Sequence, residues 1–290
     1  TKEQKNKISL FCNLPYESVI MVENVKTIYE VPIKLYNEGI LRQIFKHFNL
    51  KKTNEVVLNL WKRFLKKLVN LNGEVSIGIV GKYTNLSESY KSLNEALFHS
   101  GIFNNTRVKI SWIDSRKLKN INDCYKVLNK FHGILVPGGF GKDGSDGKIN
   151  AIKYSKKSKK PFLGICFGMQ LAIIESIRNL KGLEKASSTE FGKTPIPVIS
   201  MMHEWIKNKK KFKQDLNNLG GSMRLGSYES KIKKGTKAFS IYKNLTIHER
   251  HRHRYEVNHN FIEKIERSGI VISGMSPDGN LVEIMERDDH

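Results

Sequence analysis

The sequence predicts an α/β fold, with a mostly parallel central sheet and helices on both faces of that sheet. From residue 75 onward, short apolar segments alternate with segments that have the length and spacing of helices. Two of the apolar segments run directly into glycine-rich turns. Strands that alternate with helices form parallel sheets, because each helix returns the chain to the same end of the sheet. Functional residues of such sheets gather at the carboxyl ends of the strands.

The individual elements follow from the apolar pattern. A strand at 75–80 is followed by a helix at 88–99, with Ser87 as a plausible N-cap and Gly101 at its end. The later elements are a strand at 108–113, a strand at 134–136, a helix at 149–157, a strand at 162–165 and a helix at 169–177.

The chain before residue 73 has a different pattern. Apolar residues occur at helical spacing over 35–48, and 55–71 has the pattern of an amphipathic helix. Asn72 and Gly73 form a typical helix stop. We therefore expect three parts: an N-terminal segment at 1–50, a linker helix within 51–72, and the main domain at 73–290.

The composition limits the class of protein. The chain has 290 residues, of which 39% are hydrophobic, enough for one large domain or for one domain with an appendage. No apolar run approaches the roughly 20 residues that span a bilayer, and no signal-peptide pattern is present. We expect no membrane association. Because the chain opens on Thr1 rather than Met, we expect it to be a piece of a longer polypeptide.

The cysteines indicate a reducing compartment. Cys12, Cys124 and Cys166 form an odd set without the spacing of a disulfide framework, and this favours a cytoplasmic protein. No cysteine or histidine spacing is typical of a zinc site, so we expect no metal.

The charge is strongly basic. A net charge of +22 and a pI near 9.8 leave a nucleic-acid-binding protein as one alternative. Lys and Arg are scattered along the chain, however, and no helix-turn-helix, zinc-finger or RNA-binding aromatic signature accompanies them. We expect a solvated basic surface and no specific nucleic-acid partner. Steep salt-dependent retention on DNA would support the alternative.

Cys166 lies in the pattern of a nucleophile elbow. The segment at 161–170 reads PFLGICFGMQ, a short apolar strand that turns sharply into a helix around the cysteine. Such a turn requires small neighbours, and the N-terminus of the following helix favours a thiolate. Taken alone, the segment is equally compatible with a buried cysteine in an ordinary strand–turn–helix.

A second glycine-rich loop follows the strand at 134–136, in the segment GILVPGGFG. A main chain without side chains can approach a substrate closely, and acyl chemistry needs N–H groups aimed at an oxyanion. We therefore predict that the N–H groups of Gly139 and Phe167 form an oxyanion hole. A phosphate-binding loop or a plain turn between strand and helix remains the alternative.

These two segments resemble the class I glutamine amidotransferases, and more specifically the glutaminase half of the CTP synthase family. Further segments carry the resemblance through nearly the whole chain, including residues 7–12 and 28–32 near its start. The other matching segments read VGKY, SYKS, STEF, GGSMRLG, ERHRHRYEVN and LVEIME.

The resemblance implies glutamine hydrolysis with Cys166 as nucleophile. It places Glu190 at the α-ammonium of the substrate, and Arg254 with Tyr255 at its α-carboxylate. Each assignment has a structural alternative, such as a helix cap, a surface charge or an ion pair with Glu249 or Glu256. The other residues that the resemblance places around L-glutamine are Gly138, Phe140, Gly168, Met169 and Gln170.

The resemblance also implies a mobile lid and a catalytic base. Gly220 and Gly221 would form the hinge of the lid, and Arg224 would couple it to activation by GTP. A tight β-turn is the structural alternative. The catalytic His and Glu of the family would lie beyond His290, so no histidine of this chain is assigned as the base.

For the full enzyme, the resemblance implies a homotetramer in which a synthetase domain of the same polypeptide uses ATP with Mg²⁺ to amidate UTP. GTP would be the activator. No cofactor is expected in this fragment. Two alternatives stay open: an inactive, glutaminase-like regulatory or binding module, and another class I glutaminase subunit or γ-glutamyl hydrolase.

Overall fold

The computed structural model describes residues 1–51, 58–82, 90–201, 204–207, 210–213 and 223–290. The chain divides by its internal contacts into two compact units. The first comprises Thr1–Gly73 with Phe98–Arg107, and the second comprises Glu74–Leu97 with Val108–His290. Each unit is described by itself.

The first unit is helical and has few buried apolar side chains. Tyr29 is at its centre and packs against the rings of Trp61, Phe64 and Phe98. The indole Nε1 of Trp61 donates a 2.7 Å hydrogen bond to the Tyr29 carbonyl, and Tyr29 Oη lies 2.6 Å from His99 Nε2. Its α-helices are α1 (Lys2–Phe11), α2 (Val31–Asn37), α3 (Ile40–His47) and α4 (Asn59–Val69), with 3-10 turns at Tyr16–Ser18 and Ile28–Glu30.

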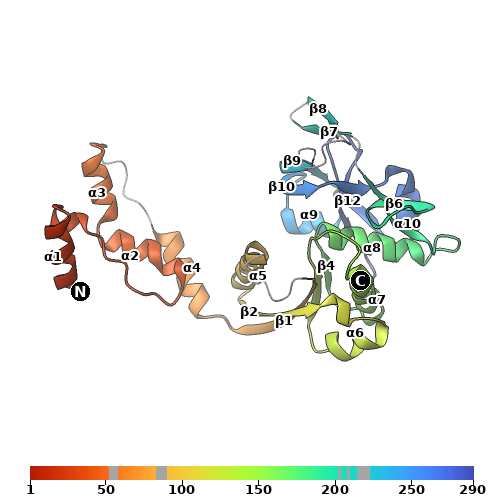
Figure 1. Ribbon diagram of the computed structural model, residues 1–290, viewed down its shortest axis with the longest axis horizontal. Helices are drawn as coiled ribbons and strands as arrows, with labels where there is room; N and C mark the ends of the chain where they lie inside the picture. The colour runs from red at the N-terminus through yellow and green to blue at the C-terminus, as the bar shows by residue number, and fades with distance from the viewer. Residues whose placement is uncertain (52–57, 83–89, 202–203, 208–209, 214–222) are drawn as a thin grey trace. The chain divides into compact units, whose positions relative to one another are not determined.

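The second unit contains the predicted parallel sheet (Figure 1). The strand order is β2-β1-β3-β4, and β3 pairs in parallel with both β1 and β4. The register sets Val136 beside Gly164, so the turns after β3 and β4 lie at the same edge of the sheet. The strands are β1 (Gly73–Gly81), β2 (Thr106–Asp114), β3 (Gly133–Val136) and β4 (Phe162–Gly164).

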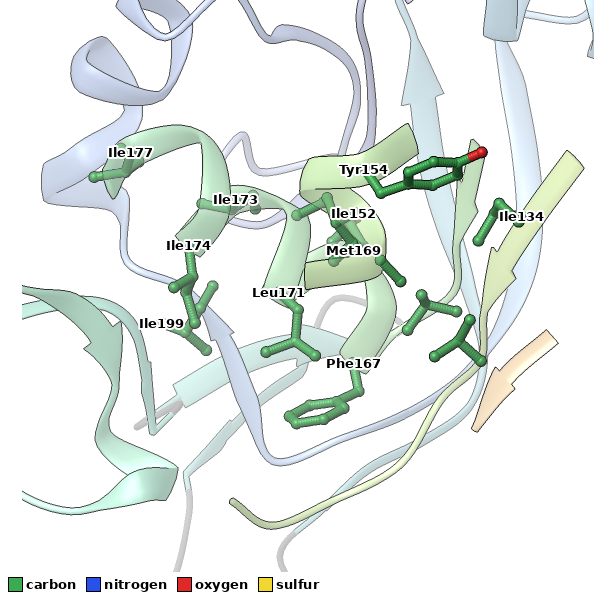
Figure 2. Packing of buried hydrophobic residues seen from close by; sticks show 14 of the residues in the cluster. Ile134, Ile152, Tyr154, Phe167, Met169, Leu171, Ile173, Ile174, Ile177 and Ile199 are labelled. Carbon is green, nitrogen blue, oxygen red and sulfur yellow. The ribbon is translucent and has the colours of Figure 1, made fainter. Parts of the chain in front are cut away.

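Helices pack with this sheet into one large core (Figure 2). Helix α8 (Phe167–Arg178) is buried at every position from Phe167 to Ile177, and its Leu171 and Ile174 contribute fully buried side chains. Helices α6 (Ile121–Leu128), α7 (Ser145–Ser158) and α10 (Ile262–Arg267) also contribute side chains to this core, whereas α9 (Lys237–Tyr242) packs in a smaller cluster. The remaining described helix is α5 (Lys91–Phe103).

The four predicted strands and the three predicted helices of the second unit all occur, which confirms the α/β prediction. Gly101 does not end its helix, because α5 continues to Phe103. The helical spacing over 35–48 falls on two helices, α2 and α3, which are separated at Gly39. Ser87, the expected N-cap of the helix at 88–99, lies outside the described residues. The first part of the predicted linker helix, at 52–57, does so too.

A mostly antiparallel region completes the second unit, with β5 and β6 as its parallel pair, and the sequence did not indicate it. Its four-stranded sheet has the order β10-β9-β12-β13, a three-stranded sheet has the order β11-β6-β5, and β7 pairs with β8. The strands are β5 (Ala186–Ser188), β6 (Ile196–Met201), β7 (Glu204–Lys207), β8 (Lys210–Lys213), β9 (Arg224–Ile232), β10 (Thr246–His253), β11 (Tyr255–Val257), β12 (Val271–Met275) and β13 (Val282–Glu286).

The remaining 3-10 turns of this unit are at Ser115–Lys117, Thr189–Phe191 and His259–Phe261. Among the helices that the structure describes, none is both long and apolar enough to cross a membrane.

Candidate active site

Cys166 has the strained backbone of a nucleophile elbow. Its φ of 54° and ψ of −105° lie in a region that non-glycine residues rarely occupy, between the end of β4 and the start of α8. The two flanking glycines are required by space. A Cβ at Gly164 would come within 2.6 Å of the Gly168 carbonyl carbon, and one at Gly168 within 2.1 Å of the Val136 carbonyl oxygen. The sharp turn therefore depends on close backbone contact between the strand, the turn and the helix.

The glycine loop after β3 passes directly beside Cys166. A Cβ on Gly138 would lie 3.6 Å from the Cys166 Cβ and 3.9 Å from its Sγ. A Cβ on Gly139 would lie 3.8 Å from the Phe167 ring. The residues predicted to form the oxyanion hole are thus neighbours of one another and of Cys166. The oxyanion role itself stays a prediction.

A small pocket opens at this edge of the sheet. Seven of the predicted site residues line it, together with Arg252 and His253, which the sequence did not indicate. Its lining consists of Gly139, Phe140, Cys166, Gln170, Glu190, Arg252, His253, Arg254 and Tyr255. Three predicted residues, Phe167, Gly168 and Met169, are instead buried in the first turn of α8.

Glu190 and Gln170 are fixed in the pocket by main-chain contacts. The Gly141 N–H donates a 2.7 Å hydrogen bond to Glu190 Oε1, which ties this carboxylate to the glycine loop. Burial raises the pKa of Glu190, while the Gly141 N–H and the charge of Arg254 oppose that change. Gln170 donates a 2.7 Å hydrogen bond from Nε2 to the Tyr255 carbonyl, so its amide nitrogen connects α8 to β11.

Lys148 lies behind the glycine loop and is only 3% exposed. Its Nζ would be 3.5 Å from a Cβ on Gly139 and lies 4.9 Å from the centroid of the Phe167 ring. Burial, and then the charge of Lys82, lower the pKa of Lys148 to about 8. This cation lies against both predicted oxyanion residues, and the sequence analysis did not select it.

Arg224 is fully enclosed in a cluster of charges. It is 1% exposed, forms a bidentate ion pair with Glu283, and has its Nη1 atom 3.3 Å from Glu256 Oε1. The guanidinium also lies over the Tyr228 ring, 4.3 Å from its centroid. The predicted coupling of Arg224 to GTP stays a prediction, while its observed contacts are ion pairs. Gly220 and Gly221 lie outside the described residues.

Two histidines of β10 border this cluster and differ in charge. Although burial lowers the pKa of His253, the Glu256 carboxylate and a hydrogen bond with Cys166 raise it to about 10. The pKa of His251 is lowered to about 4 by burial and by the charges of Arg224 and His253. At neutral pH, His253 is therefore an imidazolium and His251 a neutral imidazole. Their shared face was visible in the sequence, because residues two apart in a strand point to the same side.

The chain matches two known families. Residues 85–290 match Glutamine amidotransferase class-I, and residues 1–50 match the CTP synthase N-terminus. The chain belongs to the class I glutamine amidotransferase family. The resemblance drawn from the sequence segments is therefore confirmed.

Curated relatives place this amidotransferase domain within a longer type of chain. This chain is 49% identical over 288 residues to a CTP synthase of Pelagibacter ubique (strain HTCC1062). It is 47% identical over 288 residues to a CTP synthase of Sinorhizobium medicae (strain WSM419). Each match covers 99% of this chain and 53% of the relative. The chain thus spans about half the length of the curated relatives it matches.

A solved amidotransferase structure has the same fold. It is the glutaminase domain of a Trypanosoma brucei CTPS with bound acivicin, 34% identical to this chain, with a TM-score of 0.64. The match covers 73% of this chain and 81% of the other.

The part of this amidotransferase chain that the structure describes contains no group of three or more His, Cys, Asp or Glu side chains placed to hold a metal ion.

Proposed function

We propose that this chain is the glutamine-hydrolysing half of a CTP synthase. Cys166 would hydrolyse L-glutamine, and the ammonia would serve the ATP-dependent amidation of UTP to CTP in the full enzyme. One observation carries the proposal: Cys166, in a strained elbow, shares a pocket with the glycine loop, Glu190 and Arg254. The match of 99% of the chain to CTP synthases supports the same reading.

The pocket offers opposite charges for the two ends of an amino acid. Glu190 suits the α-ammonium of glutamine, and Arg254, beside Tyr255, suits its α-carboxylate. The Gly141 N–H fixes Glu190, while Gln170 fixes the main chain at Tyr255. The binding groups are therefore held before substrate arrives, which reduces the entropy lost on binding.

The proposed reaction is a two-step acyl transfer. The Cys166 sulfur attacks the side-chain amide carbon of glutamine, and the N–H groups of Gly139 and Phe167 stabilise the tetrahedral oxyanion. The C–N bond then breaks, the nitrogen takes up a proton and leaves as ammonia, and a glutamyl thioester remains. Water attacks the thioester, releasing glutamate and restoring the thiol. By resemblance, the general base and its Glu partner would come from sequence beyond His290.

The full enzyme would divide its tasks between parts of the chain. We assign 1–50 to the end of the synthetase domain, 51–72 to the linker and 73–290 to the glutaminase domain. ATP with Mg²⁺ would bind in the synthetase domain of a homotetramer, and no step proposed here uses them. GTP activation would act through the lid formed by Gly220, Gly221 and Arg224.

Covalent labelling tests this function. We expect acivicin, a glutamine analogue that is bound in the trypanosomal structure, to add once to Cys166 and to be displaced by excess L-glutamine. Peptide mass mapping locates the adduct. Cys12 is the matched control because it is exposed, whereas burial raises the pKa of Cys124 to about 12 and leaves it unreactive.

The Cys166→Ala variant should lose labelling and at least about a thousandfold of any glutaminase activity, measured as glutamate release. The Cys12→Ala variant should retain both. An adduct on Cys12, or labelling that glutamine does not reduce, would contradict the assignment. Labelling of Cys166 without turnover would instead favour an inactive glutamine-binding module.

A further inference from the structure

The active site contains a histidine to which the resemblance gave no role. His253 ends β10, is 9% exposed, and lines the same pocket as Cys166. Its ring is a hydrogen-bond partner of the Cys166 side chain. A buried imidazole in contact with a nucleophilic sulfur is in a position to control the charge on that sulfur.

The His253 ring is held from behind. Its Nδ1 atom lies 2.8 Å from Glu256 Oε1, and Glu256 is itself 4% exposed. Because Nδ1 is engaged by this carboxylate, we assign Nε2 to the side that faces the sulfur. Arg224 in turn holds Glu256 at 3.3 Å and also pairs with Glu283. Each link is a buried, charge-assisted contact, so the ring has little freedom to turn.

Arg224 can neutralise one of the two buried carboxylates in this cluster, and a protonated His253 would neutralise the other. Arg224 contributes one positive charge, whereas Glu256 and Glu283 contribute two negative charges. An unbalanced charge is costly away from water. A protonated His253 brings the sum to zero. His251 does not fill this role, because its pKa is lowered to about 4.

We propose that His253 is the positively charged partner of the Cys166 sulfur, a positioning residue oriented by Glu256 and kept protonated by the Arg224–Glu256–Glu283 cluster. This inference rests on the proposed function, in which Cys166 is the nucleophile. As an imidazolium, His253 has no free lone pair with which to accept a proton. Its role is therefore distinct from that of the general base, which the resemblance places beyond His290.

Several titratable or charged groups surround the ring and enter any pH dependence. They are Cys166 before α8, His251 on β10, Glu256 on β11, Arg224 on β9 and Glu283 on β13. The ring centroids of His251 and His253 are 5.0 Å apart, so the two histidines share one environment. His251 is the control from the same strand face: its Nδ1 lies 3.4 Å from Glu283 Oε2 and 3.5 Å from Arg224 Nη1, and Cys166 is not among the groups that shift its pKa.

The test is the pH dependence of Cys166 alkylation by iodoacetamide in the full chain, followed by peptide mass mapping. In the His253→Gln variant, we expect the rate at pH 7 to fall by about tenfold and its midpoint to move at least about one pH unit upward. The Glu256→Gln variant should move the midpoint in the same direction. The His251→Gln variant should leave it unchanged.

A further variant separates charge from packing. His253→Lys restores a cation, so it should recover part of the alkylation rate that His253→Gln loses, provided that circular dichroism shows both variants folded. Equal midpoints in wild type and folded His253→Gln would overturn the proposal. A shift of the same size in His251→Gln would also do so, because it would show that packing alone is responsible.

The alkylation experiment does not depend on glutamine binding. If acivicin fails to label Cys166 while His253→Gln still shifts the alkylation midpoint, the proposed function fails and the ion pair stands. If acivicin labels Cys166 and the midpoint does not move, the function stands and the role of His253 is rejected.

Discussion

The two walls of the candidate active site differ in composition: one consists of glycine-rich turns and the other of buried charged side chains. One wall, the elbow wall, consists of the turns after β3 and β4 and contains Gly138, Gly139 and Cys166. The other, the charged wall, consists of buried charges on β9, β10, β11 and β13, among them Arg224, His253 and Glu256. The first wall depends on the absence of side chains, and the second depends on how side chains are paired.

This difference determines how each wall fails when it is changed. On the elbow wall, one methyl group added at Gly164 or Gly168 would collide with the backbone, so the fold itself must move. On the charged wall, a substitution causes no backbone clash but leaves a buried charge without its partner. Both walls meet at Cys166, which the elbow places and His253 contacts.

The largest expected effect is on the elbow wall. In Gly168→Ala, the new Cβ would lie 2.1 Å from the Val136 carbonyl oxygen, a distance that atoms do not tolerate. We expect a loss of more than about 4 kcal/mol in the free energy of unfolding, or no folded protein, by urea denaturation followed by circular dichroism. Gly138→Ala is the control, because its Cβ meets Cys166 at an ordinary 3.6 Å. Similar stabilities for these two variants would show that the turn is not tightly packed.

The next effect is on the charged wall. Arg224→Met leaves Glu256 and Glu283 buried without their cation, so we expect it to lower the free energy of unfolding by about 3–5 kcal/mol. The double variant Arg224→Met, Glu283→Gln removes one of the stranded charges and should recover part of the loss. Urea denaturation at pH 7 measures both. A single-variant loss below about 1 kcal/mol would mean that the cluster is open to water.

A third prediction concerns Lys148, a buried charge that does not belong to the charged wall. Lys148 is a buried charge on the elbow wall, and no carboxylate among the described residues forms an ion pair with it. Its pKa is lowered from 10.5 to about 8, chiefly by burial, so the folded state disfavours its charged form. Lys148→Met should therefore stabilise the chain, by up to about 3 kcal/mol at pH 7.

The gain from Lys148→Met has a defined pH window. Below pH 8 the lysine is charged in both states, and wild type bears the full cost of burying it. Between pH 8 and 10.5 the unfolded chain keeps the proton that the folded chain has lost, so wild-type stability rises with pH relative to the variant. Melting temperatures at pH 7 and pH 9.5 check this. A gain that stays constant with pH would assign it to packing instead of charge.

The smallest expected effect lies on the same strand as Arg224. Lys231 and Glu229 form a 2.6 Å ion pair on the exposed side of β9. Water screens this pair, so Lys231→Ala should change the free energy of unfolding by less than about 1 kcal/mol. Measuring Lys231→Ala and Arg224→Met in one denaturation series compares an exposed and a buried ion pair on the same strand. Equal losses would remove the distinction drawn between buried and exposed pairs.

The sequence predicted the elbow wall closely. The order strand, glycine, cysteine, glycine, helix at 162–177 is a local pattern, and its geometry is set by residues that are neighbours along the chain. The parallel sheet was predictable for a similar reason, since apolar strands alternating with helices have few ways to pack. Gly139 and Phe140 line the same pocket as Cys166 because the register of β3 and β4 brings their turns together.

The charged wall could not be predicted in the same way. The family resemblance of the GGSMRLG segment assigned Arg224 to a lid, and no local pattern indicated Glu283 as its partner, 59 residues away. His251 and His253 have the same residue type and the same strand face, yet their pKa values move in opposite directions. That difference depends on the charges each ring meets after folding: burial and the cations Arg224 and His253 lower the pKa of His251, whereas Glu256 and Cys166 raise that of His253.

The sequence by itself therefore determined the turn that holds Cys166, the glycines around it and the parallel strands that end beside it, because each follows from steric and apolar rules acting over a few residues. Only the tertiary structure decided the antiparallel pairing that sets His253 opposite Arg224 and brings both to Glu256. The physical reason is that burial and charge pairing are properties of positions in space. A histidine becomes a cation or a neutral ring only once its neighbours are in place.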